Sequence, residues 1–139
     1  MTKHTNNGPS CPSCESKLLN AHPTIAEWFR TIVKPFSPTC HVSWSWRGKE
    51  DQEQAFLDGK SKLHFPNSMH NKLDDYDNPC SMALDLFELD GNGMACWHYG
   101  FFRDIAQHSD KSSARIIWGG TWKTISDNDH FQMDESKDS

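Results

Sequence analysis

Three polar side chains that can bind a metal stand out in this sequence. His70 lies in a long polar segment, Asp85 interrupts the apolar run 83–87, and His130 lies close to the C-terminal end. A carboxylate inside an apolar strand is costly unless it is paired or bound to a metal. Two imidazoles and one carboxylate, with a fourth position open to water, are a ligand set of catalytic zinc, which activates that water for hydrolysis.

Each of these signals is weak when taken alone, so other interpretations stay open. A histidine such as His130 is more often a surface or satisfied core residue than a ligand. Asp85 could pair with a lysine instead of a metal. A serine two residues before a histidine occurs often by chance, and the acidic residues at 74, 75 and 77 are typical of a solvated loop.

Zinc hydrolysis also needs a general base that is not a ligand and a cation that holds substrate or the developing oxyanion. Asp127, three residues before His130, can lie near the metal without binding it. Arg47 is the candidate cation. It follows the alternating segment 42–46, which predicts a strand whose polar face carries Ser43, Ser45 and Arg47.

The remaining pattern predicts alternating short elements. Thr24-Ile-Ala-Glu27 is typical of a capping box, and Pro35 is expected to end the helix that follows. Further helices are expected at 50–58, ended by Gly59, and at 97–108, with strands at 83–89, 116–118 and 130–133, a turn at 90–93 and a long polar segment at 61–79.

Length and composition limit the class of protein. A chain of 139 residues with net charge −5 and six Trp indicates one aromatic-rich domain and disfavours a nucleic-acid binder. No apolar run is long enough for a membrane anchor, and the N-terminal residues do not resemble a secretory signal. We expect an irregular arm over 1–20, a domain over 21–133, a disordered tail over 134–139, and a monomer.

The cysteines leave a second metal site open. There are five, an odd number that argues against a disulfide framework. Cys11-Pro-Ser-Cys14 can chelate a structural zinc or cycle between redox states, and Cys40 with His41 could complete a four-ligand site. The alternative is a flexible thiol pair in the N-terminal arm.

Four motifs in order resemble those of the peptidoglycan-cleaving zinc peptidases. They are Ser68-x-His70, Ala83-Leu-Asp85-Leu, Trp118-Gly-Gly-x-Trp122 and Asp127-x-x-His130-Phe-Gln132, and the likeness runs from about His22 to Met133. The family includes D-alanyl-D-alanine carboxypeptidases and the L-alanyl-D-glutamate endopeptidases that serve as phage endolysins. It shares its fold with the hedgehog signalling domain. The resemblance implies a small α+β domain with an antiparallel sheet flanked by helices.

The resemblance also implies roles for individual residues. His70, Asp85 and His130 would bind the zinc, Asp127 would be the base, Arg47 would bind substrate and stabilise the transition state, and Ser68 would contact substrate. The sequence departs from the family because Asp85 follows His70 by fifteen residues instead of about seven, with an insertion near 72–81. The apolar neighbours of Asp85 favour it as the ligand over the aspartates at 74, 75 and 77.

We therefore expect zinc-dependent hydrolysis of a peptide bond in peptidoglycan stem peptides. Aspartate at position 127, where the carboxypeptidases carry glutamate, favours the endolysin type of L-alanyl-D-glutamate endopeptidase. Such an enzyme would be made in the host cytoplasm and reach the wall after the membrane is opened. The rivals are a D-alanyl-D-alanine carboxypeptidase, a non-catalytic zinc-stabilised binding module, and a thiol redox protein acting through Cys11 and Cys14.

Overall fold

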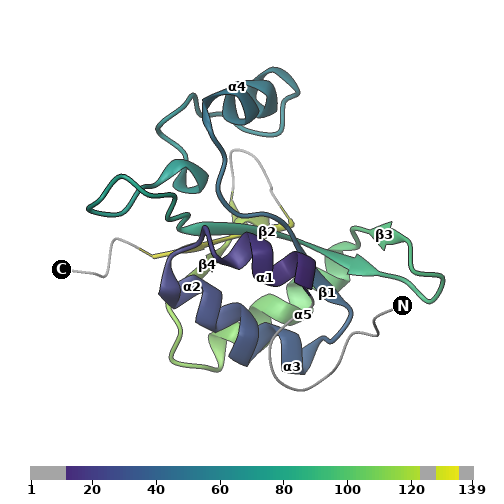
Figure 1. Cartoon of the computed structure of the whole chain (residues 1–139). Coiled ribbons are helices and arrows are strands. Elements are labelled where there is room, and N and C mark those ends of the chain that lie inside the picture. Colours follow the sequence, from purple (N-terminus) through teal and green to yellow (C-terminus); the bar gives the residue numbers. More distant parts are fainter. Residues whose placement is uncertain (1–11, 123–127, 135–139) are drawn as a thin grey trace.

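The computed structural model describes residues 12–122 and 128–134 and has the predicted α+β architecture. One antiparallel sheet has the strand order β1 (Cys40–Trp44), β2 (Ala83–Leu89), β5 (His130–Met133) and β4 (Ile116–Trp118). A short strand, β3 (Ala95–Cys96), pairs with the end of β2. The sheet runs across the middle of the molecule (Figure 1) and holds the elements of the site in place.

Most of the helices cover one face of this sheet (Figure 1). They are α1 (Pro12–Leu18), α2 (Pro23–Trp28), a π-helical segment η1 (Phe29–Val33), α3 (Lys34–Phe36) and α5 (Tyr99–Asp110). The hydrophobic core lies between these helices and the sheet, and its largest fully buried side chains include Phe29, Phe102, Phe131, Ile25 and Leu84. The helical layer thus takes up the apolar face of the sheet.

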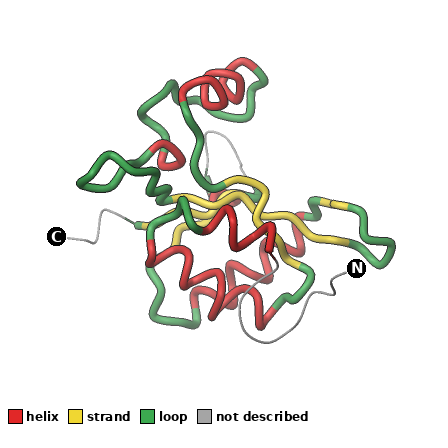
Figure 2. The backbone as a smooth tube through the Cα atoms, in the orientation of Figure 1, coloured by secondary structure: helices red, strands yellow, loops and turns green. Residues whose placement is uncertain are grey.

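The opposite face of the sheet carries the polar insertion. Helix α4 (Lys49–Leu57) and the 3₁₀ turn η2 (Met69–Asn71) lie on this side, connected by loops (Figure 2). Acidic residues occupy the first turn of α4, where the helix dipole favours them, and Gly59 follows its end with φ +76°. A second 3₁₀ turn, η3 (Gly119–Thr121), follows β4.

The N-terminal segment is more ordered than expected. The sequence predicted an irregular arm over 1–20, but residues 12–18 form α1, whose Cys14 and Leu18 are buried in the core. The Glu15 carboxylate accepts bidentate hydrogen bonds from the Arg30 guanidinium at 2.8–3.1 Å, and these bonds connect α1 to η1. These tertiary contacts stabilise a helix that has little signal in its own composition.

Two predicted features of the next helix are wrong. The N-cap of α2 is His22, whose Nδ1 accepts from the Thr24 N–H at 3.0 Å, and Pro23 occupies the first turn in place of the Thr24 capping box. Pro35 does not end the helical segment. The backbone first widens into the π-helical η1, and Pro35 then lies in the first turn of α3, where its missing N–H is tolerated.

Strand β1 departs from the predicted alternation. Its pairing with β2 shifts register between Val42, opposite Leu86, and Trp44, opposite Asp85. This bulge turns Trp44 away from the core, so that it is 41% exposed while Val42 is 1% exposed. Val42, Trp44 and Trp46 therefore do not share one apolar face, and Ser45 and Arg47 are buried instead of exposed.

The other predicted strands are confirmed, whereas β3 was not foreseen. Helix α5 begins at Tyr99, two residues later than predicted, and Trp97 is 55% exposed. Across the two stretches of chain that the structure describes, no helix combines the length and the apolar character needed to cross a bilayer.

Candidate metal centre

Asp85 reaches the site because of strand alternation. Leu84 and Leu86 on β2 are fully buried in the core beneath the helices, so Asp85 between them points to the opposite face of the sheet. Its side chain is nevertheless only 8% exposed. The apolar run that looked anomalous in the sequence is a central strand that presents one carboxylate to the site.

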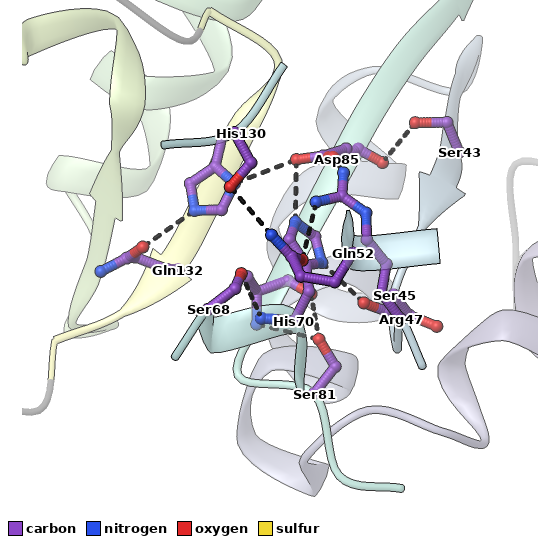
Figure 3. Close-up of polar contacts among 12 residues, drawn as sticks. Ser43, Ser45, Arg47, Gln52, Ser68, His70, Ser81, Asp85, His130 and Gln132 are labelled. Atoms are coloured by element: carbon purple, nitrogen blue, oxygen red, sulfur yellow. Dashed lines mark hydrogen bonds and ion pairs between the residues drawn. The ribbon is translucent and has the colours of Figure 1, made fainter. Parts of the chain in front are cut away.

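His130 comes from the neighbouring strand and lies directly opposite Asp85 in the β2–β5 register. Cross-strand partners share a face of the sheet, so the two side chains meet. His130 Nδ1 lies 3.0 Å from Asp85 Oδ1, and His130 Nε2 lies 2.8 Å from Gln132 Oε1 (Figure 3). Gln132 is on the same face, two residues further along β5.

His70 enters from η2, and Ser68 fixes the start of that turn. The Ser68 hydroxyl accepts from the His70 N–H at 3.1 Å, and Asn71 Oδ1 accepts from the Ser68 N–H at 3.0 Å, which completes a capping box. The turn places His70 Nε2 at 3.2 Å from Asp85 Oδ1. Ser68 therefore caps the start of η2. Its contact with substrate remains a prediction.

The three residues fit a zinc ion. One donor atom each from His70, Asp85 and His130 lies within 4.8 Å of the other two, and the imidazole ring centroids are 5.1 Å apart. The ring nitrogen of His70 that faces away from Asp85 lies 2.6 Å from the Ser45 carbonyl oxygen, which accepts its hydrogen. Metal-binding histidines nearly always make such a second hydrogen bond. The aspartates at 74, 75 and 77 lie outside this group and are exposed.

Electrostatics keeps Asp85 ionised. Burial alone would raise the pKa of Asp85, but the charge of His70 and hydrogen bonds from His130 and His70 hold it well below its usual range. Arg47 Nη2 donates to Asp85 Oδ2 at 2.8 Å. One carboxylate oxygen thus faces the two imidazoles while the other binds the guanidinium (Figure 3).

A buried amide network positions Arg47, and sequence reasoning missed it. Gln52, which is fully buried on α4, accepts from Arg47 Nη1 at 3.4 Å and from Asn71 Nδ2 at 3.2 Å. Its own Nε2 donates to Ser61 Oγ and the Leu63 carbonyl. Asn71 Nδ2 also donates to the Arg47 carbonyl. The polar residues on α4 and η2 therefore hold Arg47 and His70 together.

The two histidines of this candidate group line a pocket of about 270 Å³. Its floor includes His70, His130 and Arg47, and its rim includes Lys60, Lys62 and Trp122. Trp122 also packs against the His130 ring, with centroids 5.2 Å apart. A substrate would approach the two histidines through this pocket.

Two predicted residues lie outside the described part of the chain. They are Asp127, expected as the base, and Cys11, expected as one ligand of a structural zinc. Cys14 is buried and not part of a flexible thiol pair, with its Sγ 3.4 Å from His41 Nδ1. Burial raises the pKa of the Cys40 thiol well above its usual value. The structural zinc remains a prediction.

Comparison with known proteins extends this description. No family model matches the sequence, and no curated protein matches it. The three-dimensional fold, however, is similar to that of an endopeptidase of known structure. That protein is the L-Ala D-Glu endopeptidase ChiX of Serratia marcescens, with a TM-score of 0.71 and 23% identity over 90% of this chain and 89% of that chain. The likeness confirms the predicted fold class.

Proposed function

We propose that this protein is a zinc-dependent peptidase that cleaves a peptide bond in the stem peptides of bacterial peptidoglycan, with L-alanyl-D-glutamate endopeptidase specificity. The observation that carries the proposal is the convergence of His70, Asp85 and His130, of which the two histidines line a pocket. The fold shared with an L-Ala D-Glu endopeptidase supports the choice of substrate. The ordered sequence motifs support the family of peptidoglycan-cleaving zinc peptidases.

The chain's own groups have distinct parts in such a reaction. Zinc, when bound, supplies a Lewis acid that activates water and polarises the scissile carbonyl. Ser45 fixes the orientation of His70 through its carbonyl oxygen. Asp127, which lies three residues before His130, would take the proton from the attacking water and pass it to the leaving amine.

Arg47 contacts the proposed metal ligand Asp85 and also lines the substrate pocket. Its Nη2 holds Asp85 in one orientation, and its side chain also lines the pocket, where a cation can bind substrate or steady developing negative charge. Arg47 is 6% exposed and lies over the Trp44 ring, 5.3 Å from its centroid. These contacts fix the guanidinium before substrate arrives.

The charge of the pocket matches an anionic peptide. Lys60 and Lys62 are exposed on its rim, although the chain as a whole is acidic with net charge −5. The D-glutamate of a stem peptide keeps a free carboxylate next to the bond that this class of enzyme cleaves. Local positive charge in an acidic protein favours such a substrate over a neutral peptide.

We also propose that the enzyme acts as a phage endolysin, since aspartate at position 127 favours that branch. In that role it would meet its substrate after the membrane of the host is opened. The proposal includes a single catalytic zinc and action as a monomer.

The test is digestion of purified peptidoglycan followed by mass spectrometry of the products. We expect new D-glutamate amino termini, loss of cleavage after chelation, and recovery with zinc. Asp127→Asn should abolish cleavage while keeping zinc, whereas the exposed Asp110→Asn, at the end of α5, should cleave normally. Release of single D-alanine residues would favour the carboxypeptidase. Zinc binding without any cleavage would favour the binding module.

A further inference from the structure

A second group of metal-binding side chains lies at the end of the β2–β3 hairpin. One donor atom each from Glu88, Cys96 and His98 lies within 4.8 Å of the other two. Glu88 Oε1 is 3.6 Å from Cys96 Sγ and 3.7 Å from His98 Nδ1. None of these residues belongs to the centre built on Asp85, and the proposed peptidase reaction does not use them.

The sheet brings these three side chains together by register. Glu88 on β2 is the direct cross-strand partner of Cys96 on β3, so both side chains point to the same face. His98 follows Cys96 by two residues and is the N-cap of α5. Because side chains alternate along a strand, Glu88 points to the face opposite that of Asp85, three residues earlier.

The chemistry of the three donors suits zinc better than a hard cation. A thiolate and an imidazole are preferred zinc ligands, and a carboxylate completes many such sites. Packing does not explain the group, because the His98 side chain is 74% exposed and that of Glu88 is 27% exposed.

We propose that Glu88, Cys96 and His98 form a second zinc site, which clips the β2–β3 hairpin to the start of α5. Binding would exchange the thiol proton of Cys96 for the metal and release the proton to solvent. Among the strands that the structure describes, the two-residue β3 pairs with β2 off the main path of the sheet, so a metal clip would hold a short element at the sheet's periphery. The clip would be structural and separate from the proposed catalytic zinc.

Cobalt titration of the metal-free protein tests this proposal without relying on activity. The catalytic group contains no cysteine, so a thiolate-to-cobalt charge-transfer band reports on a cysteine site alone. We expect the band in the unaltered protein, its loss in Cys96→Ser, and cobalt affinity weakened by more than about tenfold in His98→Gln. Cys80→Ser removes a thiol outside the group and should keep the band.

The outcomes separate this site from the peptidase centre. A band that is absent from the unaltered protein, or that persists in Cys96→Ser, would overturn the proposal, and the second result would assign the thiolate to another cysteine. His98→Gln alters an exposed side chain, so it provides a folded variant if Cys96→Ser does not fold. Cys96→Ser should still cleave peptidoglycan, so a failure of the clip leaves the proposed peptidase function standing.

Discussion

Arg47 and Asp85 form a buried ion pair in which Nη2 of the guanidinium lies 2.8 Å from Oδ2 of the carboxylate. The two side chains are each 8% exposed. The pair leaves Oδ1 of the carboxylate to face the imidazoles of His70 and His130. Arg47 is therefore part of the framework of the candidate metal centre as well as a lining residue of the pocket.

Replacement of Arg47 by methionine should lower the free energy of unfolding by about 3–5 kcal/mol in the metal-free protein, because it leaves a buried carboxylate without its cation. Zinc should reduce this loss, since it supplies positive charge to the same carboxylate. Urea denaturation with chelator and with zinc measures both values. Arg30→Met, which breaks the partly exposed pair with Glu15, should lose about 1 kcal/mol or less in either condition. An equal loss for Arg47→Met with and without zinc would contradict the arrangement.

Asp85→Asn should abolish zinc binding at the catalytic group, because the neutral amide cannot replace the anionic ligand that both histidines face. Asp74→Asn should bind zinc normally, since Asp74 is exposed and its Oδ1 accepts from the Tyr76 and Asn78 N–H groups of its own loop. Zinc content measured by mass spectrometry in a Cys96→Ser background excludes the proposed Glu88–Cys96–His98 site from the comparison. Loss of zinc in Asp74→Asn, with normal zinc content in Asp85→Asn, would instead identify Asp74 in the inserted loop as the ligand.

Gln52→Leu should lower the free energy of unfolding by about 1–3 kcal/mol, because the amides and guanidinium that bind Gln52 would be left unsatisfied. It should also lower kcat more than it raises KM, because Arg47 loses the partner that orients it. The control is Gln54→Leu on the same helix, where the side chain is exposed and pairs with Asp58. Unchanged kinetics in a destabilised Gln52→Leu protein would limit Gln52 to a role in folding.

Gly120→Ala should destabilise the protein by about 1–3 kcal/mol, since overpacking forces a shift of the neighbouring ring. A Cβ at this position would lie 2.2 Å from Cζ2 of Trp118, whose indole donates to the Asn128 carbonyl and stacks on Phe131. Thermal melting followed by tryptophan fluorescence measures the effect. The control is Gly91→Ala in the turn after β2, where the added Cβ would have no neighbouring atom within 4 Å. Its melting temperature should be that of the unaltered protein.

Reversal of the charges on the pocket rim should weaken substrate binding. We expect the Lys60→Glu, Lys62→Glu double variant to raise KM for an anionic stem peptide by about three- to tenfold at low salt, with a smaller effect at high salt. Steady-state kinetics at two ionic strengths measures this. Lys111→Glu, beyond α5 on the other face of the sheet, reverses one lysine charge away from the pocket and should leave KM as it was.

The parts of the site that lie on regular elements could be predicted from the sequence. Asp85 stood out because a carboxylate between Leu84 and Leu86 conflicts with an apolar strand, and that conflict marks function. His130 stood out through the motif Asp127-x-x-His130-Phe-Gln132, which opens the predicted strand 130–133. Both residues can be picked out from their neighbours in the sequence. A regular antiparallel pairing of β2 with β5 then places them opposite each other.

The supporting residues could not be predicted in this way. Gln52 is one of several polar residues on a short helix, and its burial depends on contacts with Arg47 and Asn71 from other segments. Helix α1 likewise depends on packing against β1 instead of on its own propensity. Pro35 was expected to end a helix because the residue before a proline avoids helical backbone angles. The π-helical segment η1, after which Pro35 lies in α3, has no recognised signature in the local sequence.

The bulge between Val42 and Trp44 makes the length of β1 more important than its composition. Ser43 is the additional residue, and it turns Trp44 toward the face where its ring supports Arg47. Without the bulge, regular pairing would place Trp44 opposite Leu84 and direct its indole into the helical layer. Natural variants that keep the present length of this strand should therefore also keep the bulge.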